Sequence, residues 1–306
     1  MFITHHRGIF FVLTGIIVAA SLASLAFFGL KFGIDFTGGT LVEVSYNATP
    51  PDVLVLTQEL QKLGLTDISI RASGDHDYIV RSGTITSSER AGLAPALALG
   101  GKYPSTISQL NEIGPTIGAE LRAKALYALG LVLLCILLFI AYVFRKVSKP
   151  VSSWVYGLIA LVTLVHDVIV PVGFFAALGH FTGASVDTLF VTAVLTVLGF
   201  SIHDTIVVFD RVRENLAINH DSNRKESFTD TAGRALNQTF VRSINTSLTV
   251  LFTLVVLYIY GPASTHDFAL TLLVGIIAGT YSSIFLATPL LVEVAHRQGN
   301  NIGKKK

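Results

Sequence analysis

Residues 196–215, TVLGFSIHDTIVVFDRVREN, determine how the rest of the chain is interpreted. They form an apolar helical segment that contains a His203–Asp204 pair and ends in a cluster of charges. Insertion scales put the cost of an Asp at the centre of a membrane helix at about 2.5–3.5 kcal/mol, so an ionisable residue there indicates function and a partner. The stretch therefore predicts a membrane helix that carries a functional carboxylate.

The composition of the whole chain agrees with this prediction. Of the 306 residues, 51% are hydrophobic and only 14% are charged, and the mean hydropathy is +0.64, outside the range of an ordinary soluble domain. The net charge of +2 is too small to indicate a nucleic-acid partner. A single Cys135 excludes an internal disulfide and a thiolate cluster. We expect no metal and no cofactor.

Six apolar segments are long enough to cross a bilayer at about 1.5 Å per residue. The first ends in SLASLA, which resembles a signal-peptide cleavage site, but its 21 uncharged residues exceed the signal core of about 7–15 residues. The sequence therefore predicts six transmembrane helices. They are expected at residues 9–29, 123–144, 153–178, 187–209, 240–260 and 267–292.

Residues 31–122 are polar and differ from the apolar segments on either side. The pattern TLVEVSY at 40–46 alternates as a strand does, and Thr86 or Ser87 with Glu89 forms a capping box that starts a helix. The expected order, strand-helix-strand-strand-helix-strand, predicts a ferredoxin-like α/β domain inserted between the first two membrane helices. The strands are expected at 40–46, 67–72, 78–82 and 105–113, and the helices at 51–63 and 85–99.

The positions of Lys and Arg predict the orientation. Basic residues occur in both tails and in the loops after the second and fourth spans, whereas the short loops at 180–186 and 261–266 have none. The positive-inside rule then places both termini in the cytoplasm and residues 31–122 outside it. The expected division is a tail with the first helix (1–30), the extracytoplasmic domain (31–122), five helices (123–292) with a cytoplasmic loop (210–239), and a basic tail (293–306).

Thr192, Thr196, Gly199 and His203 recur at helical spacing and form one narrow stripe. Such a stripe is expected to face other helices or a wet cavity. Asp204 lies about 100° round the helix from His203, so the two side chains point in different directions.

Arg242 is the candidate partner of Asp204. Asp204 lies about 8 Å from the cytoplasmic end of its span at 1.5 Å per residue, and a long Arg side chain at the start of the fifth span can reach that depth. Asn245 and Thr246 follow on the same face as Arg242. The pair predicts a proton site, because burial and a nearby Arg act on a carboxylate in opposite directions. The alternative is a static ion pair, or an Arg242 that snorkels to the interface.

His166 and Asp167 form a second His–Asp dipeptide, in the third span. Two such dipeptides could suggest a metal site or an intramembrane protease. However, neighbouring side chains on a helix point in different directions, and no His-Glu-x-x-His run exists. We therefore expect a packing or proton-path role for His166 and Asp167.

The stretch GIDFTGG at residues 33–39 is rich in glycine but is not a phosphate-binding loop, because no Lys follows its last Gly. It predicts a tight junction where the chain leaves the membrane. The DRVREN cluster predicts a solvated continuation of its helix, with Asp210–Arg213 and Arg211–Glu214 pairs.

Five motifs, in order, are similar to those of the SecF family of Sec translocon accessory proteins, and the resemblance covers nearly the whole chain. They are FGIDFTGG at 32–39, IGPTIGAELRAKAL at 113–126, the segment 164–179, GFSIHDTIVVFDRVREN at 199–215 and NQTFVRSINTS at 237–247.

The resemblance implies a non-enzymatic, six-span half of a resistance-nodulation-division type bundle in the plasma (inner) membrane of a prokaryote. It implies SecD and the SecYEG channel as partners, and proton flow that drives an external domain acting on secreted polypeptide. It places the essential Asp and Arg at Asp204 and Arg242. It also marks Gly33, Asp35, Phe36, Gly38 and Gly39 as the motif at the membrane exit.

The chain departs from the family pattern at two places. His203 stands where the family often has Asn, and RKVSKPVSSW at 145–154 replaces an aromatic, Glu and Arg pattern. Two other functions remain open from the residues. A small-molecule or ion exporter would need an aromatic-lined pocket in the external domain, which has few aromatics (Tyr46, Tyr78, Tyr103). A passive scaffold for the translocon would need neither Asp204 nor Arg242.

Overall fold

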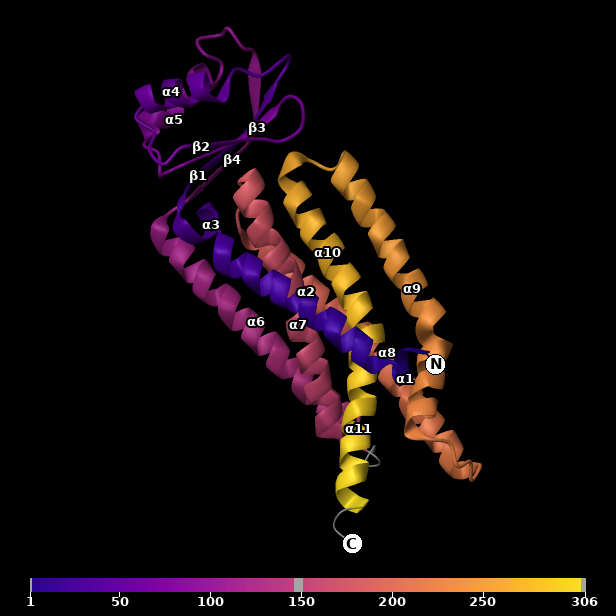
Figure 1. Cartoon of the computed structure of the whole chain (residues 1–306). Helices are drawn as coiled ribbons and strands as arrows, with labels where there is room; N and C mark the ends of the chain where they lie inside the picture. The colour runs from indigo at the N-terminus through magenta and orange to yellow at the C-terminus, as the bar shows by residue number, and fades with distance from the viewer. Residues whose placement is uncertain (1, 146–150, 304–306) are drawn as a thin grey trace.

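The protein is described by a computed structural model that covers residues 2–145 and 151–303. A small α/β domain sits at one end of a long helical bundle (Figure 1). In the described part of the chain, six helical segments are long and apolar enough to cross a membrane, as the sequence predicts. They are α2 (Arg7–Phe28), α6 (Pro115–Val143), α7 (Ser153–Thr182), α8 (Thr188–Asp221), α9 (Phe228–Tyr260) and a last segment, His266–Gln298.

The last segment is one apolar rod of three parts. It consists of α10 (His266–Ser282), a π-helical turn η2 (Ser283–Ala287) and α11 (Thr288–Gly303). Three short helices complete the membrane part. They are α1 (Phe2–His5), α3 (Ile34–Thr37) and η1 (Ala263–Thr265).

The inserted domain has the predicted order of elements. They are β1 (Gly39–Tyr46), α4 (Val53–Lys62), β2 (Ser69–Ala72), β3 (Asp77–Ser82), α5 (Ser87–Leu97) and β4 (Ser105–Ile113). The sheet order is β2-β3-β1-β4 with every pair antiparallel, which is the ferredoxin-like arrangement. The apolar faces of α4 and α5 close its core through Leu56, Leu60 and Leu93. The capping box is present, with Thr86 as N-cap and Glu89 as its partner.

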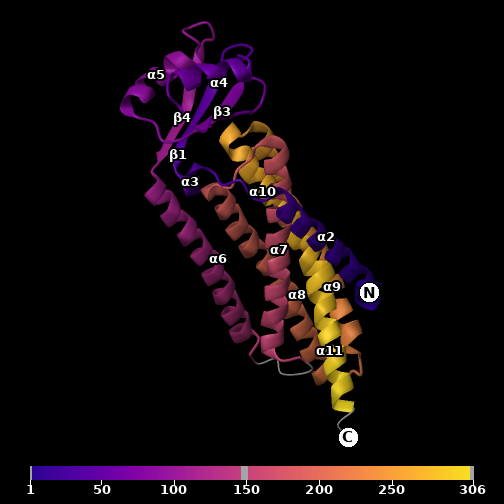
Figure 2. The same ribbon diagram turned by 60° about the vertical axis from the view of Figure 1, so that its left-hand side comes forward.

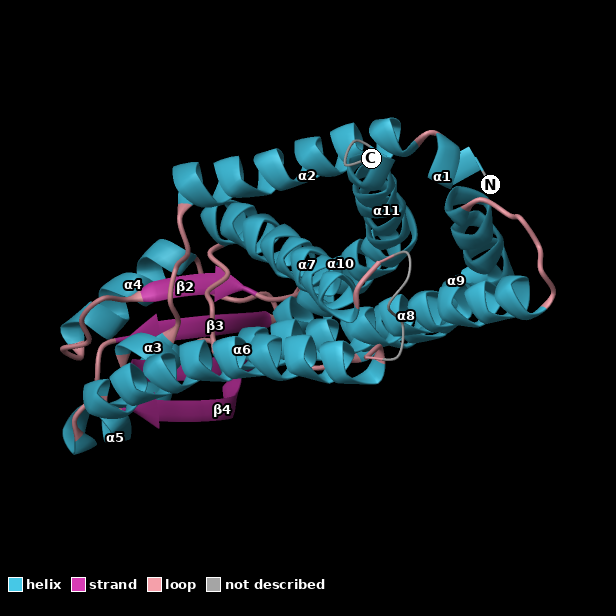
Figure 3. Ribbon diagram, turned by 90° about the horizontal axis from the view of Figure 1, so that it is seen from below, coloured by secondary structure: helices cyan, strands magenta, loops and turns pink. Residues whose placement is uncertain are grey.

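The bundle is built around α10 and its continuation. In the most apolar 18-residue stretch of the last segment, 67% of the residues are buried, whereas the corresponding share is 6% in α2 and in α6. α10 packs on α7, α8 and α9, while α2 and α6 lie on opposite outer edges (Figure 3). The sheet sits over the outer ends of α7 and α10, and α6 leads directly from β4 (Figure 2). The inserted domain is thus joined to the outer helices α2 and α6 along the chain, and it lies over the central helices.

Both helices that flank the predicted cytoplasmic loop continue into it. α8 runs to Asp221 and α9 begins at Phe228, so most of residues 210–239 is helical. The expected Asp210–Arg213 and Arg211–Glu214 ion pairs are present. The divergent stretch 145–154 and the basic tail fall partly outside the described residues, at 146–150 and 304–306.

Two glycines let α10 approach α8 closely. A Cβ at Gly275 would lie 2.3 Å from a Val197 methyl, and one at Gly279 would lie 2.8 Å from the Ser201 Cβ. Small residues four positions apart allow close helix packing in membranes, where association depends on contact rather than on hydrophobic burial.

A Gly275→Leu substitution is therefore expected to force α10 away from α8 and lower the stability of the purified protein by about 1–3 kcal/mol. Thermal unfolding in detergent would measure this. Gly130→Leu on α6 is the matched control, because nothing lies within 4 Å of its added Cβ. Equal unfolding temperatures for the two variants would show that this contact does not hold the bundle together.

Candidate functional site

Asp204 on α8 points into the bundle and is 3% exposed. Its Oδ2 accepts no hydrogen bond, and the nearby hydroxyls of Thr205 and Ser243 are also buried without a partner among the described residues. The Ser243 hydroxyl and the charges of His203 and Arg242 are near enough to act on the carboxylate electrostatically. An unsatisfied buried carboxylate costs free energy, and proton binding reduces that cost. Asp204 therefore remains the candidate proton site that the sequence predicts.

Arg242 lies on the neighbouring helix α9 and is exposed. Its backbone carbonyl accepts a hydrogen bond from the Thr246 hydroxyl at 2.9 Å, and Asn245 is exposed beside it. Among the ion pairs of residues 2–145 and 151–303, none joins Arg242 to Asp204. The Asp204–Arg242 pair as a functional unit therefore stays a prediction, and in this conformation Arg242 is near Asp204 without forming an ion pair with it.

The polar stripe of α8 faces away from the bundle. Thr192, Thr196, Gly199 and His203 are all exposed, and the Thr192 and Thr196 hydroxyls each bond to the helix's own carbonyls at 2.8 Å. The sequence predicted that other helices or a wet cavity would cover this stripe. The described helices of this chain leave it uncovered, so any protein cover has to come from outside them.

His166 and Asp167 form a buried hydrogen-bonded pair on α7. His166 Nδ1 lies 2.8 Å from Asp167 Oδ1, and Asp167 Oδ2 accepts from Ser201 of α8 and, at 2.9 Å, from Ser282 of α10. Asp167 thus ties three helices together. Sequence reasoning identified the dipeptide but missed both serines, because serines are common in membrane helices and their register across helices cannot be read from one sequence.

The GIDFTGG stretch forms the junction that the sequence predicted. The Gly33 N–H donates to the Val186 carbonyl at 2.7 Å. Asp35 Oδ2 accepts from the backbone N–H and the hydroxyl of Thr188, at 2.8 and 2.5 Å. Phe36 is buried against the ends of the membrane helices. The segment therefore binds the start of α8 directly.

Two glycines of this junction have backbone angles that favour glycine. Gly38 has φ +80° and Gly39 has φ +133°. A Cβ at Gly39 would lie 2.6 Å from the Ser82 carbonyl, and one at Gly38 would lie 2.8 Å from the backbone of Pro115. Close backbone approach and left-handed geometry together explain the glycines.

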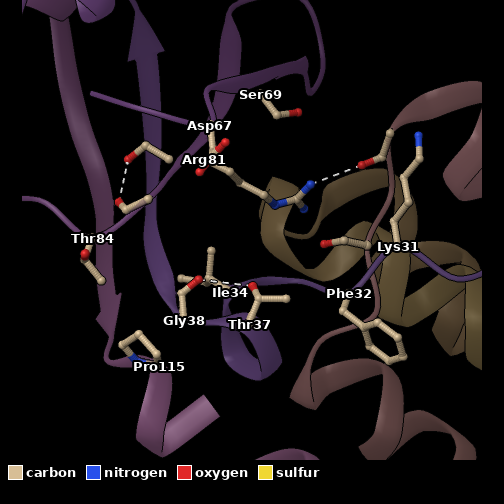
Figure 4. A pocket seen from close by; sticks show the side chains of 14 residues that line it. Lys31, Phe32, Ile34, Thr37, Gly38, Asp67, Ser69, Arg81, Thr84 and Pro115 are labelled. Carbon is tan, nitrogen blue, oxygen red and sulfur yellow. Dashed lines mark hydrogen bonds between the residues drawn. The ribbon is translucent and has the colours of Figure 1, made fainter. Parts of the chain in front are cut away.

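The inserted domain is held to the bundle by two arginines of its sheet. Arg71 on β2 makes a two-pronged ion pair with Asp267 at the start of α10, at 2.5 and 2.9 Å. Arg81 on β3 donates to the Gly183 carbonyl at 3.1 Å. A cavity of about 510 Å³ lies here. Figure 4 shows Arg81 pointing across it, with Lys31 and Phe32 on the far side.

Burial shifts the pKa values of ionisable side chains at this junction. It raises the pKa of Asp187 to about 6, and the nearby carboxylates Asp35 and Asp267 add to the effect. Burial likewise raises the pKa of Glu43 and lowers the pKa of Arg81. The junction between domain and bundle is thus sensitive to the pH of the compartment that it faces.

Asp267→Asn should loosen the inserted domain, because it removes a partly buried, charge-assisted pair of hydrogen bonds to Arg71. The expected loss is about 1–3 kcal/mol of docking free energy. Hydrogen exchange of the β2 amides would report it as faster exchange. Asp75→Asn, in an exposed turn of the same domain, is the control. Unchanged exchange in Asp267→Asn would exclude this ion pair as a docking contact.

Asp187 should make stability depend on pH. Its folded pKa of about 6 exceeds its ordinary 3.8, so the folded chain holds the proton more tightly than the unfolded chain does. This stabilisation is complete below about pH 4 and is lost as pH rises through 6, to a total of at most about 3 kcal/mol. Asp187→Asn should make the unfolding temperature depend less on pH over that range. Asp221→Asn, at the exposed end of α8, should not.

No group of three or more His, Cys, Asp or Glu side chains that could hold a metal ion occurs within the described ranges.

Comparisons with known proteins match most of the chain. Residues 100–297 match the family model "Protein export membrane protein SecD/SecF, C-terminal", and residues 23–50 match "SecD/SecF GG Motif", which contains Gly38 and Gly39. The chain is 40% identical to protein translocase subunit SecF of Thermobaculum terrenum, over 95% of this chain and 92% of that one. It is 34% identical to SecF of Pseudomonas aeruginosa, over 94% and 89%.

Solved structures show the same likeness. The crystal structure of SecDF from Thermus thermophilus, a translocon-associated membrane protein, matches with a TM-score of 0.79 and 30% identity over 92% of this chain. SecDF in a super-membrane-facing form matches with a TM-score of 0.66 and 28% identity. The chain spans 37% and 39% of those longer polypeptides. By fold, motifs and identity, the chain belongs to the SecD/SecF family of protein-export membrane proteins, among its SecF translocase subunits.

Proposed function

We propose that this membrane protein, an accessory subunit of Sec protein export, uses the proton gradient together with SecD to promote movement of secreted chains through SecYEG. The observation that carries the proposal is Asp204, a carboxylate buried in the bundle whose Oδ2 has no hydrogen-bond partner. A static structural carboxylate would be expected to have its hydrogen bonds satisfied. Asp204 instead resembles a group that binds and releases a proton.

The uncovered stripe of α8 supports SecD as the partner. Thr192, Thr196 and His203 are exposed on the face beside Asp204, and polar residues in membrane helices are expected to face protein or water. The matching SecDF polypeptides are more than twice as long as this chain. A separate SecD subunit would cover the stripe and complete the proton path, with His203 and Arg242 lining it.

The charged junction supports a mechanical link. α8 carries Asp204 near its middle, and the N-terminus of the same helix binds Asp35. A shift of α8 on protonation would therefore move the start of the inserted domain. In this proposal both termini are cytoplasmic and the inserted domain acts on the secreted chain outside. The relatives are named translocase subunits, and the chain would do mechanical work without making or breaking covalent bonds.

Asp204→Asn is expected to keep the fold and the assembly with SecD but to reduce protein export to the level seen without a proton gradient. The measurement is translocation of a secretory protein into inverted membrane vesicles, with and without a protonophore. Asp221→Asn removes the same charge at the exposed end of α8 and is the control. Normal gradient-dependent export by Asp204→Asn would contradict the proton role.

The same assay separates two other functions. A passive scaffold predicts normal export by both Asp204→Ala and Arg242→Ala. A small-molecule or ion exporter predicts proton counterflow that a soluble substrate stimulates in the absence of any secretory chain.

A further inference from the structure

A second acidic site lies in the bundle, apart from Asp204. Asp167 is 0% exposed and accepts three hydrogen bonds on its two oxygens, from His166, Ser201 and Ser282. An ionised carboxylate accepts at both oxygens and has no proton to donate, so three donors aimed at one group indicate the charged form. In the described part of the chain, its ion-pair partner is His166 alone.

The charge of this pair depends on one proton. If His166 is neutral and donates Nδ1–H to Asp167, the buried pair carries a net charge of −1. If a proton from water also binds Nε2, the pair becomes an imidazolium and a carboxylate with no net charge. Burying a net charge costs far more than burying a neutral, hydrogen-bonded pair. The site is therefore suited to bind one proton and release it again.

The nitrogen that would take this proton is unoccupied. His166 is 4% exposed, and its Nε2 is buried with no hydrogen-bond partner among the described residues. The ring lines a cavity of about 260 Å³ between α2, α7 and α10, together with Ile17, Val170 and Tyr281. Nε2 is thus a buried acceptor without a donor, and binding of a proton would relieve the cost of leaving it unpaired.

Polar groups near the pair come from three of the helices packed against α7, namely α10, α2 and α8. α10 contributes Tyr281, whose ring lies 6.1 Å from that of His166. α2 contributes the hydroxyl of Thr14, which lies 3.1 Å from the Tyr281 hydroxyl. α8 contributes Ser201 and, about one turn further along, the carboxylate of Asp204. Asp204 thus lies three residues along α8 from a direct donor to Asp167.

Buried hydroxyls also lie where α10 packs on α9. Two residues before Ser282 on α10, Thr280 hydrogen-bonds to Ser247 of α9 at 2.6 Å, and Ser247 donates to the carbonyl of Ser243. The Ser243 hydroxyl in turn lies beside Asp204. Immediately after Ser282, the rod changes to the π-helical turn η2, a feature that often marks functional positions. α8 and α10 are therefore both tied to Asp167 and both lead to Asp204.

We propose that His166 and Asp167 form a second proton-binding site, coupled to Asp204 through α8 and α10. This inference rests on the proposed proton-driven function and adds a second carboxylate to it. Protonation at His166 Nε2 removes the net charge that Ser201 and Ser282 stabilise, which loosens the hold of Asp167 on the two helices. The two helices then shift together, and this shift moves Asp204 and the ends of α8 and α10 that contact the inserted domain.

The first test observes His166 itself. The chain, labelled with ¹⁵N-histidine and reconstituted with SecD in nanodiscs, is titrated by NMR, and the His166 signals are assigned by their absence in His166→Gln. We expect the Nε2 resonance to report binding of a proton to the ring as the pH is lowered. Coupling of the two sites through α8 predicts that Asp204→Asn changes this response, while Asp221→Asn leaves it unchanged.

The second test measures coupling without touching either ionisable group. Ser282→Ala removes one donor to Asp167, whereas Ser283→Ala removes an equally buried hydroxyl that donates to the Thr280 carbonyl. Proton flux in vesicles with SecD should change its pH profile in Ser282→Ala and keep it in Ser283→Ala. A purely structural serine would change the amount of folded protein and leave the pH profile unaltered.

The results separate this site from the proposed function. A His166 that keeps one protonation state from about pH 5 to 9, or a titration unaffected by Asp204→Asn, would overturn the second site and leave the role of Asp204 intact. Conversely, export and flux unaffected by Asp204→Asn would remove the proposed function, whatever His166 does.

Discussion

The structure depends on how carboxylates are accommodated inside a helical bundle that excludes water. Neither backbone nor side-chain polar groups can find a partner in lipid, so each buried charge has to be satisfied by a neighbouring helix or neutralised by a proton. Asp167 follows the first course, with three donors from α7, α8 and α10. Asp204 does not, because its Oδ2 has no donor. One carboxylate thus links three helices by hydrogen bonds, and the other keeps one oxygen without a hydrogen-bond donor.

Two of the helices that bind Asp167, α8 and α10, also contact the inserted domain and its junction. α8 begins at the junction, where Thr188 binds Asp35, and α10 begins there too, where Asp267 binds Arg71. Close packing at Gly275 and Gly279 brings α8 and α10 together along this length. In the proposed function, a change of charge in the membrane would reach the inserted domain through these two helices. Gly38 and Gly39 allow the sheet to sit directly on that route.

The exposed polar stripe of α8 indicates that the bundle lacks a neighbour on this side. A membrane bundle that stands alone would turn its polar residues inward, whereas α8 has apolar residues inside and Thr192, Thr196 and His203 on the outside. α2 and α6, by contrast, present apolar surfaces suited to lipid. The difference identifies one side of the bundle as suited to a protein partner and two edges as suited to lipid.

The sequence by itself determined the elements and their class. Apolar length alone predicted six membrane helices, and alternation with capping chemistry predicted the strand and helix order of the inserted domain, because both signals are local. It also identified Asp204, Asp167 and the glycines at the membrane exit. Only the tertiary structure decided which polar groups meet. That Ser201 and Ser282 bind Asp167, that Arg242 stands apart from Asp204, and that Arg71 reaches Asp267 depend on helix rotation and register, which follow from packing between segments far apart in the chain.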